Sequence, residues 1–357
     1  MKCNLVLRAV GVAAIAVFSL VDARAAEPEL PAVRVESVRR AFHNGEHNAF
    51  TDLIRYRDSL YLTFRSCPDG HGVFPTSSII VLTSEDGSDW REVTRFSVPM
   101  RDVRDPHFLI FKEKLFVYSG AWYTGETAPE RRDMNQHLGY AVWTENGSDW
   151  SEPTTLEGTY GHYVWRAAAQ GGKAYLCARR KKDFAEARTR EERNPVVQAA
   201  LLESDDGLVW RTAGLFTEEY GNETAFFFEQ GGDILALARG GGNRNAQVLR
   251  SRAPFRAWER TELDRQVGGP LLVRWGEFLL AGGRKSIGDG PKTSLYWLAD
   301  GRLQEFAELP SGGDNSYPGF VETGPGRALV SYYSSHERDG DGKPITAIYL
   351  AELALEQ

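Results

Sequence analysis

The chain has 357 residues, with 42 lysines and arginines against 49 aspartates and glutamates, and its formal net charge is -7. This acidic balance argues against binding to nucleic acid or to anionic membranes, because both carry negative charge themselves. The hydrophobic share of 42% is that of a globular protein, which at this length needs no disulfide scaffold. Arginines nevertheless outnumber lysines by 33 to nine, so any binding role of the arginines must come from local placement.

Residues 1–25 have the pattern of a secretory signal peptide. A basic start is followed by an apolar run over 5–21 and by Ala23-Arg24-Ala25, a small-residue cleavage motif. The run contains Arg8 and is short for a membrane span, which favours cleavage over anchoring. We therefore expect a secreted or periplasmic protein without a membrane span.

A turn motif recurs along the chain. Segments 84–90, 144–150 and 204–210 each combine a Ser or Thr, an Asp-Gly or Asn-Gly pair and a tryptophan, and the tryptophans lie 60 residues apart. Weaker copies end at Trp258 and at Asp300-Gly301. Glycine and Asp or Asn suit tight hairpin turns, and the hydroxyl can bond the turn backbone. The repeat therefore predicts hairpins at the period of a structural unit.

Two strands of constant appearance precede each turn unit. The first strands are expected at 49–57, 105–113, 163–170, 222–230, 268–276 and 316–324. The second strands are expected at 58–66, 113–121, 172–180, 232–240, 276–284 and 326–334. Six four-stranded units predict an all-β fold, a six-bladed β-propeller that forms a single domain over residues 32–357.

The last repeat supplies only three strands, ending with 346–355. We expect the lone strand at 32–42 to complete this last blade, because joining the two ends of the domain removes an open sheet edge. The charged segment 183–194 is expected to be a solvent-exposed excursion with a short helix.

Alignment of the six repeats identifies two sets of equivalent residues, both at strand ends. The residues that close the second strands are Arg65, Gly120, Arg179, Arg239, Arg284 and Tyr333. The residues that open the first strands are Ala49, Arg104, Tyr163, Glu223, Gly268 and Tyr317. Both positions are expected near the axial mouth, where guanidinium groups can bind a carboxylate in bidentate fashion. The alternative is that these arginines form salt bridges between blades.

These features resemble the sialidase (neuraminidase) superfamily, which carries Asp-box (BNR) repeats in six-bladed propellers. Segment 65–72, RSCPDGHG, is similar to the loop of the acid/base aspartate, which would be Asp69. Segment 222–239 is similar to the one in which a glutamate precedes an arginine of the carboxylate-binding triad, here Glu223 and Arg239. Segment 316–334 is similar to the one with the nucleophilic tyrosine, here Tyr317.

The resemblance implies a retaining exo-glycosidase that cleaves a terminal sialic acid or a related acidic sugar without a cofactor or metal. The neutral phenol of Tyr317 would attack, because the sugar carboxylate would repel a charged nucleophile, and Glu223 would be its base. Asp69 would protonate the leaving oxygen, with His71 and Asp105 as alternatives for that role.

The sequence departs from the family in the carboxylate clamp. The arginine that the family carries on the opening strand of blade 1 is absent from segment 48–52, NAFTD. Arg65 or Arg104 is expected to substitute for it, and Arg284 is expected to be the third arginine beside Arg239. The further candidates for substrate contact are Arg166, Asp52 and Asp105.

Two other functions also fit. Segment 103–106, VRDP, resembles the Arg-Asp-Pro motif of five-bladed furanosidases and fructosidases, and Asp52, Asp105 and Glu223 would then form an acid triad. A carbohydrate-binding propeller without catalysis would instead use aromatic platforms such as Trp122 and Trp165.

Signals for a bound metal are weak. His43 and His47 have a spacing that suits zinc only on a helix, and the Asn-Gly between them favours a loop. The expected partner is an acidic glycan or sialoside, with no nucleic acid, and the sequence makes no prediction about the oligomeric state.

Overall fold

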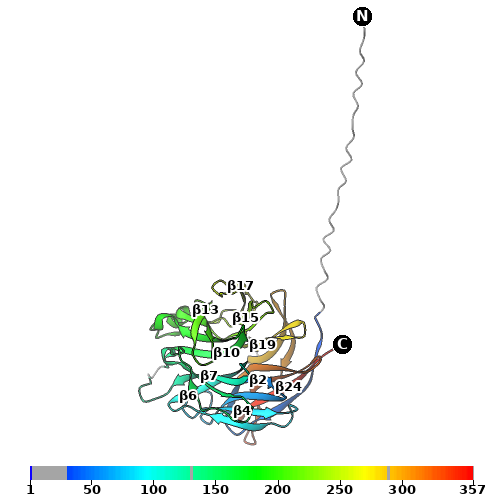
Figure 1. Cartoon of the computed structure of the whole chain (residues 1–357). Helices are drawn as coiled ribbons and strands as arrows, with labels where there is room; N and C mark the ends of the chain where they lie inside the picture. The colour runs from blue at the N-terminus through cyan, green and yellow to red at the C-terminus, as the bar shows by residue number, and fades with distance from the viewer. Residues whose placement is uncertain (2–29, 129–131, 288–289, 357) are drawn as a thin grey trace. The chain divides into compact units, whose positions relative to one another are not determined.

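Six four-stranded antiparallel sheets follow one another along the chain in this computed structural model (Figure 1). The structure describes residues 1, 30–128, 132–287 and 290–356. The expected signal peptide over 1–25 therefore lies, apart from Met1, outside the described residues. The innermost strand of each sheet contacts that of the next sheet, and the sixth returns to the first. This closed ring is a six-bladed β-propeller, as the repeats predict.

The strands have the following bounds. Blade 1 contains β2 (His47–Tyr56), β3 (Ser59–Cys67), β4 (Ser78–Ser84) and β5 (Arg91–Phe96). Blade 2 contains β6 (Arg101–Phe111), β7 (Lys114–Tyr123), β8 (Leu138–Thr144) and β9 (Thr154–Thr155). Blade 3 contains β10 (His162–Gln170), β11 (Lys173–Lys181), β12 (Val197–Ser204) and β13 (Arg211–Thr217).

The second half of the ring repeats this arrangement. Blade 4 contains β14 (Thr224–Phe228), β15 (Ile234–Ala238), β16 (Gln247–Ser251) and β17 (Glu259–Glu262). Blade 5 contains β18 (Gly268–Trp275), β19 (Phe278–Ile287), β20 (Gly290–Ala299) and β21 (Arg302–Leu309). Blade 6 contains β22 (Asn315–Gly324), β23 (Arg327–Arg338), β24 (Pro344–Leu355) and β1 (Val33–Phe42).

The N-terminal strand closes the ring. Strand β1 pairs with β24 in antiparallel fashion from Val33, opposite Leu355, to Phe42, opposite Ile348. The first strand of the described propeller is therefore the outermost strand of the last blade, and the prediction of an all-β propeller closed by this strand is confirmed. An exposed ion pair between Glu36 and Arg327 spans the same sheet at 2.7 Å.

The recurring turns have a common hydrogen-bond pattern. In the first, the hydroxyl of Ser84 accepts a bond from the Gly87 backbone at 2.9 Å, and the Trp90 indole donates to the Gly87 carbonyl at 2.9 Å. Gly87 has φ +82°, a left-handed conformation in which glycine carries no steric penalty. The next two turns repeat the bond to the hydroxyl, from Gly147 to Thr144 and from Gly207 to Ser204.

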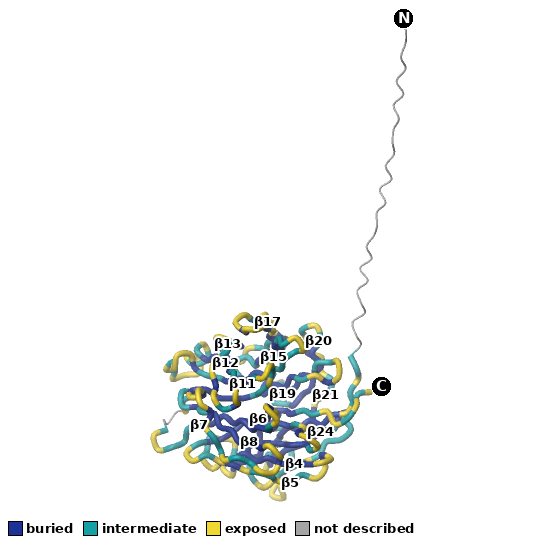
Figure 2. The backbone as a smooth tube through the Cα atoms, viewed as in Figure 1, coloured by how far each residue is buried: buried dark blue, intermediate teal, exposed yellow. Residues whose placement is uncertain are grey.

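The strands inside the molecule are formed mostly by buried residues, and exposed residues gather in the outer loops (Figure 2). The blades pack through apolar clusters that combine residues of neighbouring sheets. The helices are short: η1 (Met134–Gln136), η2 (Lys182–Phe184), α1 (Arg190–Arg193) and η3 (Asn194–Val196). None in the described part of the chain is long and apolar enough to cross a membrane. Helix α1 begins with a capping box between Thr189 and Glu192, so the expected short helix is present in the excursion.

Removal of β1 tests the closure. A chain that starts at residue 43 leaves the hydrogen-bonding edge of β24 exposed, so we expect self-association and a thermal midpoint lower by roughly 10 °C. A chain that starts at residue 31 keeps β1 and is the control. Light scattering and calorimetry measure the two effects. An unchanged, monomeric chain without β1 would contradict the role assigned to this strand.

Candidate functional site

In each of four blades, the residue that opens the first strand pairs with the residue that closes the second strand. Ala49 pairs with Arg65, Arg104 with Gly120, Tyr163 with Arg179 and Gly268 with Arg284. In blade 4 the Arg239 backbone donates to the Glu223 carbonyl at 2.9 Å, which makes the same pair. In blade 6, however, Ser316 pairs with Tyr333, so Tyr317 lies one residue beyond the aligned position. The expectation that Tyr317 and Glu223 occupy equivalent positions is therefore wrong by one residue.

The shift has a structural cause in a repeated β-bulge. The residue after the paired position has a left-handed backbone in four innermost strands: Phe50 (φ 64°), Asp105 (φ 51°), Gly269 (φ 58°) and Tyr317 (φ 54°). The strand register slips at each of these points. A bulge re-aims a side chain, and left-handed backbone in bulky residues is concentrated at functional sites. Tyr317 is in this way directed toward blade 4 although its strand belongs to blade 6.

Tyr317 and Glu223 meet through a hydrogen bond. The Tyr317 hydroxyl donates to Oε1 of Glu223 at 2.7 Å, and both side chains are buried. Arg239 donates to the other carboxylate oxygen, Oε2, at 2.7 Å, and the Gly269 backbone donates to the same oxygen at 3.2 Å. The carboxylate is therefore held on both oxygens, and one of its partners is a phenol.

The charges around this pair set its protonation. Burial alone would raise the pKa of Glu223, but the charges of Arg239 and Arg179 and the bonds from Arg239 and Tyr317 lower it to about 2. Burial and the Glu223 charge both raise the pKa of Tyr317, and Arg239 and Arg284 oppose them in part. Glu223 is thus an ionised acceptor at neutral pH, and Tyr317 is a neutral donor.

Two arginines face this pair with part of their surface open. The Arg239 side chain is 30% exposed and the Arg284 side chain 21% exposed. The Arg284 guanidinium lies 5.7 Å from the Tyr317 ring centroid, and it bonds the Asn315 carbonyl at 3.3 Å. Both can still donate hydrogen bonds to an anion beside the Tyr317 hydroxyl.

Arg65 and Arg104 are placed differently from the expected substrate ligands. Arg65 is fully buried and forms a bidentate ion pair with Asp102 at 3.0 and 3.2 Å. It also donates to the carbonyls of Gly70 and Gly72. Arg104 donates to the carbonyls of His71 and Gly72 and to Asp102. Both guanidinium groups therefore hold the loop that follows β3, and Arg65 has no surface left for a substrate.

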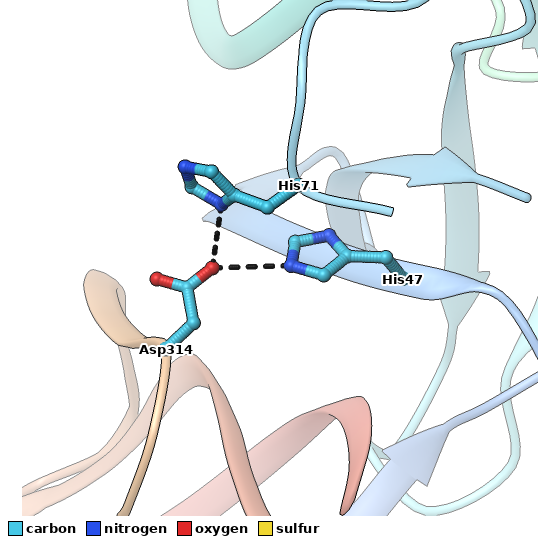
Figure 3. Close-up of side chains that lie close together, drawn as sticks. All are labelled: His47, His71 and Asp314. Atoms are coloured by element: carbon cyan, nitrogen blue, oxygen red, sulfur yellow. Dashed lines mark hydrogen bonds and ion pairs between the residues drawn. The ribbon is translucent and has the colours of Figure 1, made fainter. Parts of the chain in front are cut away.

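On the loop that Arg65 and Arg104 hold, His71 contacts Asp314 and Asp69 contacts Thr76. Nδ1 of His71 lies 2.6 Å from Oδ2 of Asp314, and Nε2 of His47 lies 3.1 Å from the same oxygen (Figure 3). The His71 side chain is 55% exposed, and its Nε2 points away from the carboxylate (Figure 3). Asp69, the expected acid/base residue, is exposed on the loop and accepts a hydrogen bond from Thr76.

His71 is connected to Tyr317 through the ring of Phe50. Its ring centroid is 5.7 Å from that of Phe50, which is 5.0 Å from that of Tyr317. Asp314 lies near the same aromatic side chains, because its Oδ1 accepts from the Tyr333 hydroxyl at 2.9 Å and the Tyr333 ring centroid is 6.0 Å from that of Tyr317. Asp314 thus links the His71 loop to the side chains around Tyr317.

His47, His71 and Asp314 are residues of the kind that can bind a metal ion. Their ligand atoms all lie within 4.8 Å of one another. Hydrogen bonding accounts for the geometry equally directly, because each imidazole contacts one carboxylate oxygen at a donor–acceptor distance. Arg284, 3.5 Å from Oδ1 of Asp314, already balances the single negative charge. These contacts favour a carboxylate that orients two histidines.

Asp52 and Arg166 form a buried connection between blades. Arg166 lies 3.3 Å from Asp52 and donates to the carbonyls of Pro270 and Pro318, so it joins β10 to three other innermost strands. Asp52 also lies 3.3 Å from His107. Burial lowers the pKa of His107 to about 4, against the raising effect of Asp52. These contacts use Asp52 and Arg166 to hold the ring together.

Asp105 is buried and accepts a hydrogen bond from the Tyr163 hydroxyl. Burial and the nearby Glu223 charge raise its pKa to about 6. The acids of the suggested triad thus have separate partners: Arg166 for Asp52, Tyr163 for Asp105, and Arg239 with Tyr317 for Glu223.

Sequence reasoning missed Asp314 and Asp102. Both lie outside the aligned positions, and each pairs with a residue far along the chain, so the repeat alignment carries no signal for them. The one available hint for Asp102 is its place two residues before Arg104 on the same strand, where both side chains point to one face.

Comparison with solved structures shows the fold. A Dyadobacter fermentans protein of unknown function superposes with a TM-score of 0.76 at 19% identity, covering 92% of this chain and 100% of its own. The Trypanosoma rangeli sialidase in complex with sialic acid has a TM-score of 0.64 at 15% identity, over 90% of this chain and 57% of its own. The phage phi92 endosialidase has a TM-score of 0.64 at 10% identity, over 90% of this chain and 69% of its own.

The resemblance to sialidases stated from the sequence is therefore confirmed for the propeller fold. No family model matches the chain, and no curated protein matches it either.

The buried pair of Asp52 and Arg166 yields a stability prediction. Asp52→Ala leaves a buried guanidinium without its carboxylate, so we expect a loss of about 3–5 kcal/mol in the free energy of unfolding. Urea denaturation measures it. Asp205→Ala, which breaks an exposed pair with Arg211, is the control and should change little. Equal effects of the two substitutions would contradict the role of Arg166 as a connection between blades.

Proposed function

We propose that the chain is a retaining exo-glycoside hydrolase of the sialidase type, which removes a terminal sialic acid or a related acidic sugar from glycans. The observation that carries this proposal is the hydrogen bond from Tyr317 to the buried, ionised Glu223, with Arg239 and Arg284 beside it. The fold shared with sialidases supports it. We also propose a secreted or periplasmic location, for which the support is the leader pattern of residues 1–25.

In the first step Oη of Tyr317 attacks the anomeric carbon, the bond from that carbon to the leaving oxygen breaks, and the phenol proton passes to Oε1 of Glu223 along their hydrogen bond. A neutral phenol approaches the anionic sugar without the repulsion that a carboxylate nucleophile would meet. Arg239 and Arg284 bind the sugar carboxylate, since guanidinium groups match its planar geometry. In the second step water attacks the anomeric carbon, the bond from that carbon to Oη of Tyr317 breaks, and Glu223 returns the proton to Oη.

A proton donor must serve the leaving oxygen in the first step and take a proton from water in the second. We propose His71 for this role in place of Asp69. Protonated His71 can donate from Nε2 while Asp314 accepts from Nδ1 and stabilises the positive charge. Arg65 and Arg104 keep the loop in place through the carbonyls of residues 70–72.

Substitution of Tyr317 and Glu223 tests catalysis against simple binding. Tyr317→Phe removes the nucleophile and Glu223→Gln removes the base, so we expect turnover of a fluorogenic sialoside to fall at least about 100-fold. Binding of sialic acid, measured by calorimetry, should persist in Tyr317→Phe. A wild-type chain that binds sialosides without turning them over would instead be a carbohydrate-binding propeller. If only glucuronide or arabinofuranoside analogues were turned over, the proposed sialic acid substrate would be wrong and that other sugar would take its place.

The acid/base assignment predicts a dependence on the leaving group. A methylumbelliferyl group departs with little protonation, whereas the galactose of a sialyllactose needs a proton. His71→Asn should therefore lower kcat/KM about 100-fold or more for sialyllactose and far less for the fluorogenic sialoside. Asp69→Asn, on the same loop, is the matched control and should leave both rates near the wild-type values.

Two results would contradict the assignment to His71. In the first, the leaving-group effect appears in Asp69→Asn and not in His71→Asn. In the second, a chelator abolishes wild-type activity and added zinc restores it, which would make His47, His71 and Asp314 a metal site.

A further inference from the structure

A cavity of about 270 Å³ opens next to Glu223 and is lined by four arginines: Arg179, Arg190, Arg193 and Arg239. No carboxylate is found among the described residues that line it. Arg239 is shared with the Tyr317–Glu223 pair, so the cavity adjoins the proposed catalytic centre. The other three arginines are not assigned to the sugar carboxylate in the proposed cleavage, although the charge of Arg179 helps to lower the pKa of Glu223.

These three arginines come from two elements of blade 3. Arg179 lies at the end of β11, and Arg190 and Arg193 belong to helix α1 in the excursion between β11 and β12. The excursion therefore places the guanidinium groups of Arg190 and Arg193 in the same cavity lining as that of Arg179. The capping box of α1 holds this short helix in position.

Within the described part of the chain, none of the three forms an ion pair with a carboxylate. Arg179 donates to the side chain of Asn222 at 2.8 Å, and its buried Nε has no partner there. Burial and the charges of Arg179 and Arg190 lower the pKa of Arg193, and the charge of Glu191 opposes them in part. Most other buried or half-buried arginines of this protein, such as Arg65 and Arg166, have carboxylate partners.

Of the four guanidinium groups that line the cavity, Arg239 is ion-paired with Glu223, and the other three form no ion pair with a described carboxylate. Like charges gathered in one cavity repel one another, and an anion bound among them reduces that repulsion. Chloride or water can occupy such a place, but guanidinium groups bind oxyanions most strongly, through paired and charge-assisted hydrogen bonds. The cavity has room for a sulfate or carboxylate group and lies within reach of a sugar bound at Arg239.

We propose that this cavity is a second anion subsite, which binds an oxyanion substituent, either a sulfate ester or a second carboxylate, of the same glycan substrate. The proposal rests on the proposed glycosidase function, since the substrate carries the group into the cavity. The preferred substrate is then a sugar with two negative charges, one at Arg239 and Arg284 and the other at Arg179, Arg190 and Arg193.

A binding experiment tests the subsite without reference to catalysis. Inorganic sulfate at millimolar concentration, with chloride adjusted to constant ionic strength, should raise the thermal midpoint of the wild-type chain. The double variant Arg190→Gln/Arg193→Gln should lose most of this rise. The control is Arg55→Gln/Arg91→Gln, which removes the same charge from exposed positions in blade 1 and should respond to sulfate as wild type does. An equal rise in all three chains would reflect general salting effects and overturn the proposal.

A kinetic experiment identifies the source of the anion. We expect kcat/KM of the wild-type chain to be about tenfold higher for a sulfated sialoside or a disialoside than for the parent monosialoside, which carries one negative charge. The Arg190→Gln/Arg193→Gln chain should lose that preference while its rate on the parent monosialoside is unchanged. Whichever of the two substrates shows the effect distinguishes sulfate from carboxylate.

The outcomes separate this inference from the proposed function. Sulfate binding without any preference among substrates would overturn the claim that the glycan supplies the anion. Absence of turnover with every sialoside would contradict the proposed function, and the binding experiment would still decide whether the anion subsite exists.

Discussion

The hydrogen bond between Tyr317 and Glu223 joins blades 4 and 6 across the axis, and the arrangement of the axial mouth depends on it. A carboxylate can remain ionised at such a buried place only if its oxygens are satisfied and a cation lies near. Arg239 supplies the cation, and the Gly269 backbone completes the second oxygen. The β-bulge at Tyr317 makes the contact possible, because it turns the phenol out of the regular strand alternation.

The arginines near the axis fall into two groups by their partners. The guanidinium groups of Arg65 and Arg166 donate their hydrogen bonds to carboxylates and backbone carbonyls, so they connect strands and hold a loop. Arg239 and Arg284 keep part of their surface open, and Arg179 has no carboxylate partner among the described residues. A buried guanidinium with all donors satisfied stabilises the fold, whereas one with free donors is available to a ligand.

The sequence was sufficient for the fold because the signals are local and repeated. The Asp-Gly or Asn-Gly turns and the strand pairs recur in register, and the lone strand at 32–42 fits the one blade that lacks a fourth strand. The candidate site was predicted less completely. Repeat alignment predicted that Glu223, Arg239 and Tyr317 lie near one another, and in the structure Arg239 and Tyr317 both contact Glu223. It could not show the bulge that shifts Tyr317 by one residue. Nor could it distinguish an arginine that pairs with Asp102 from one that faces solvent, since that depends on contacts between distant segments.

The overall charge and the local charge of this protein have opposite signs, and under the proposed function this difference favours small acidic sugars over large polyanions. A net charge of -7 repels polyanions in general, but surface charges are screened beyond about 8–10 Å at ordinary ionic strength. A small acidic sugar inside the mouth therefore experiences mainly the arginines that line it, while a large polyanion meets the acidic exterior as well. Arg190 and Arg193 extend this cationic region on the connection between β11 and β12 of blade 3. The proposed subsite for a second negative charge therefore depends on a segment of blade 3 and not on a feature that all six blades repeat. It lies to one side of the propeller axis for this reason.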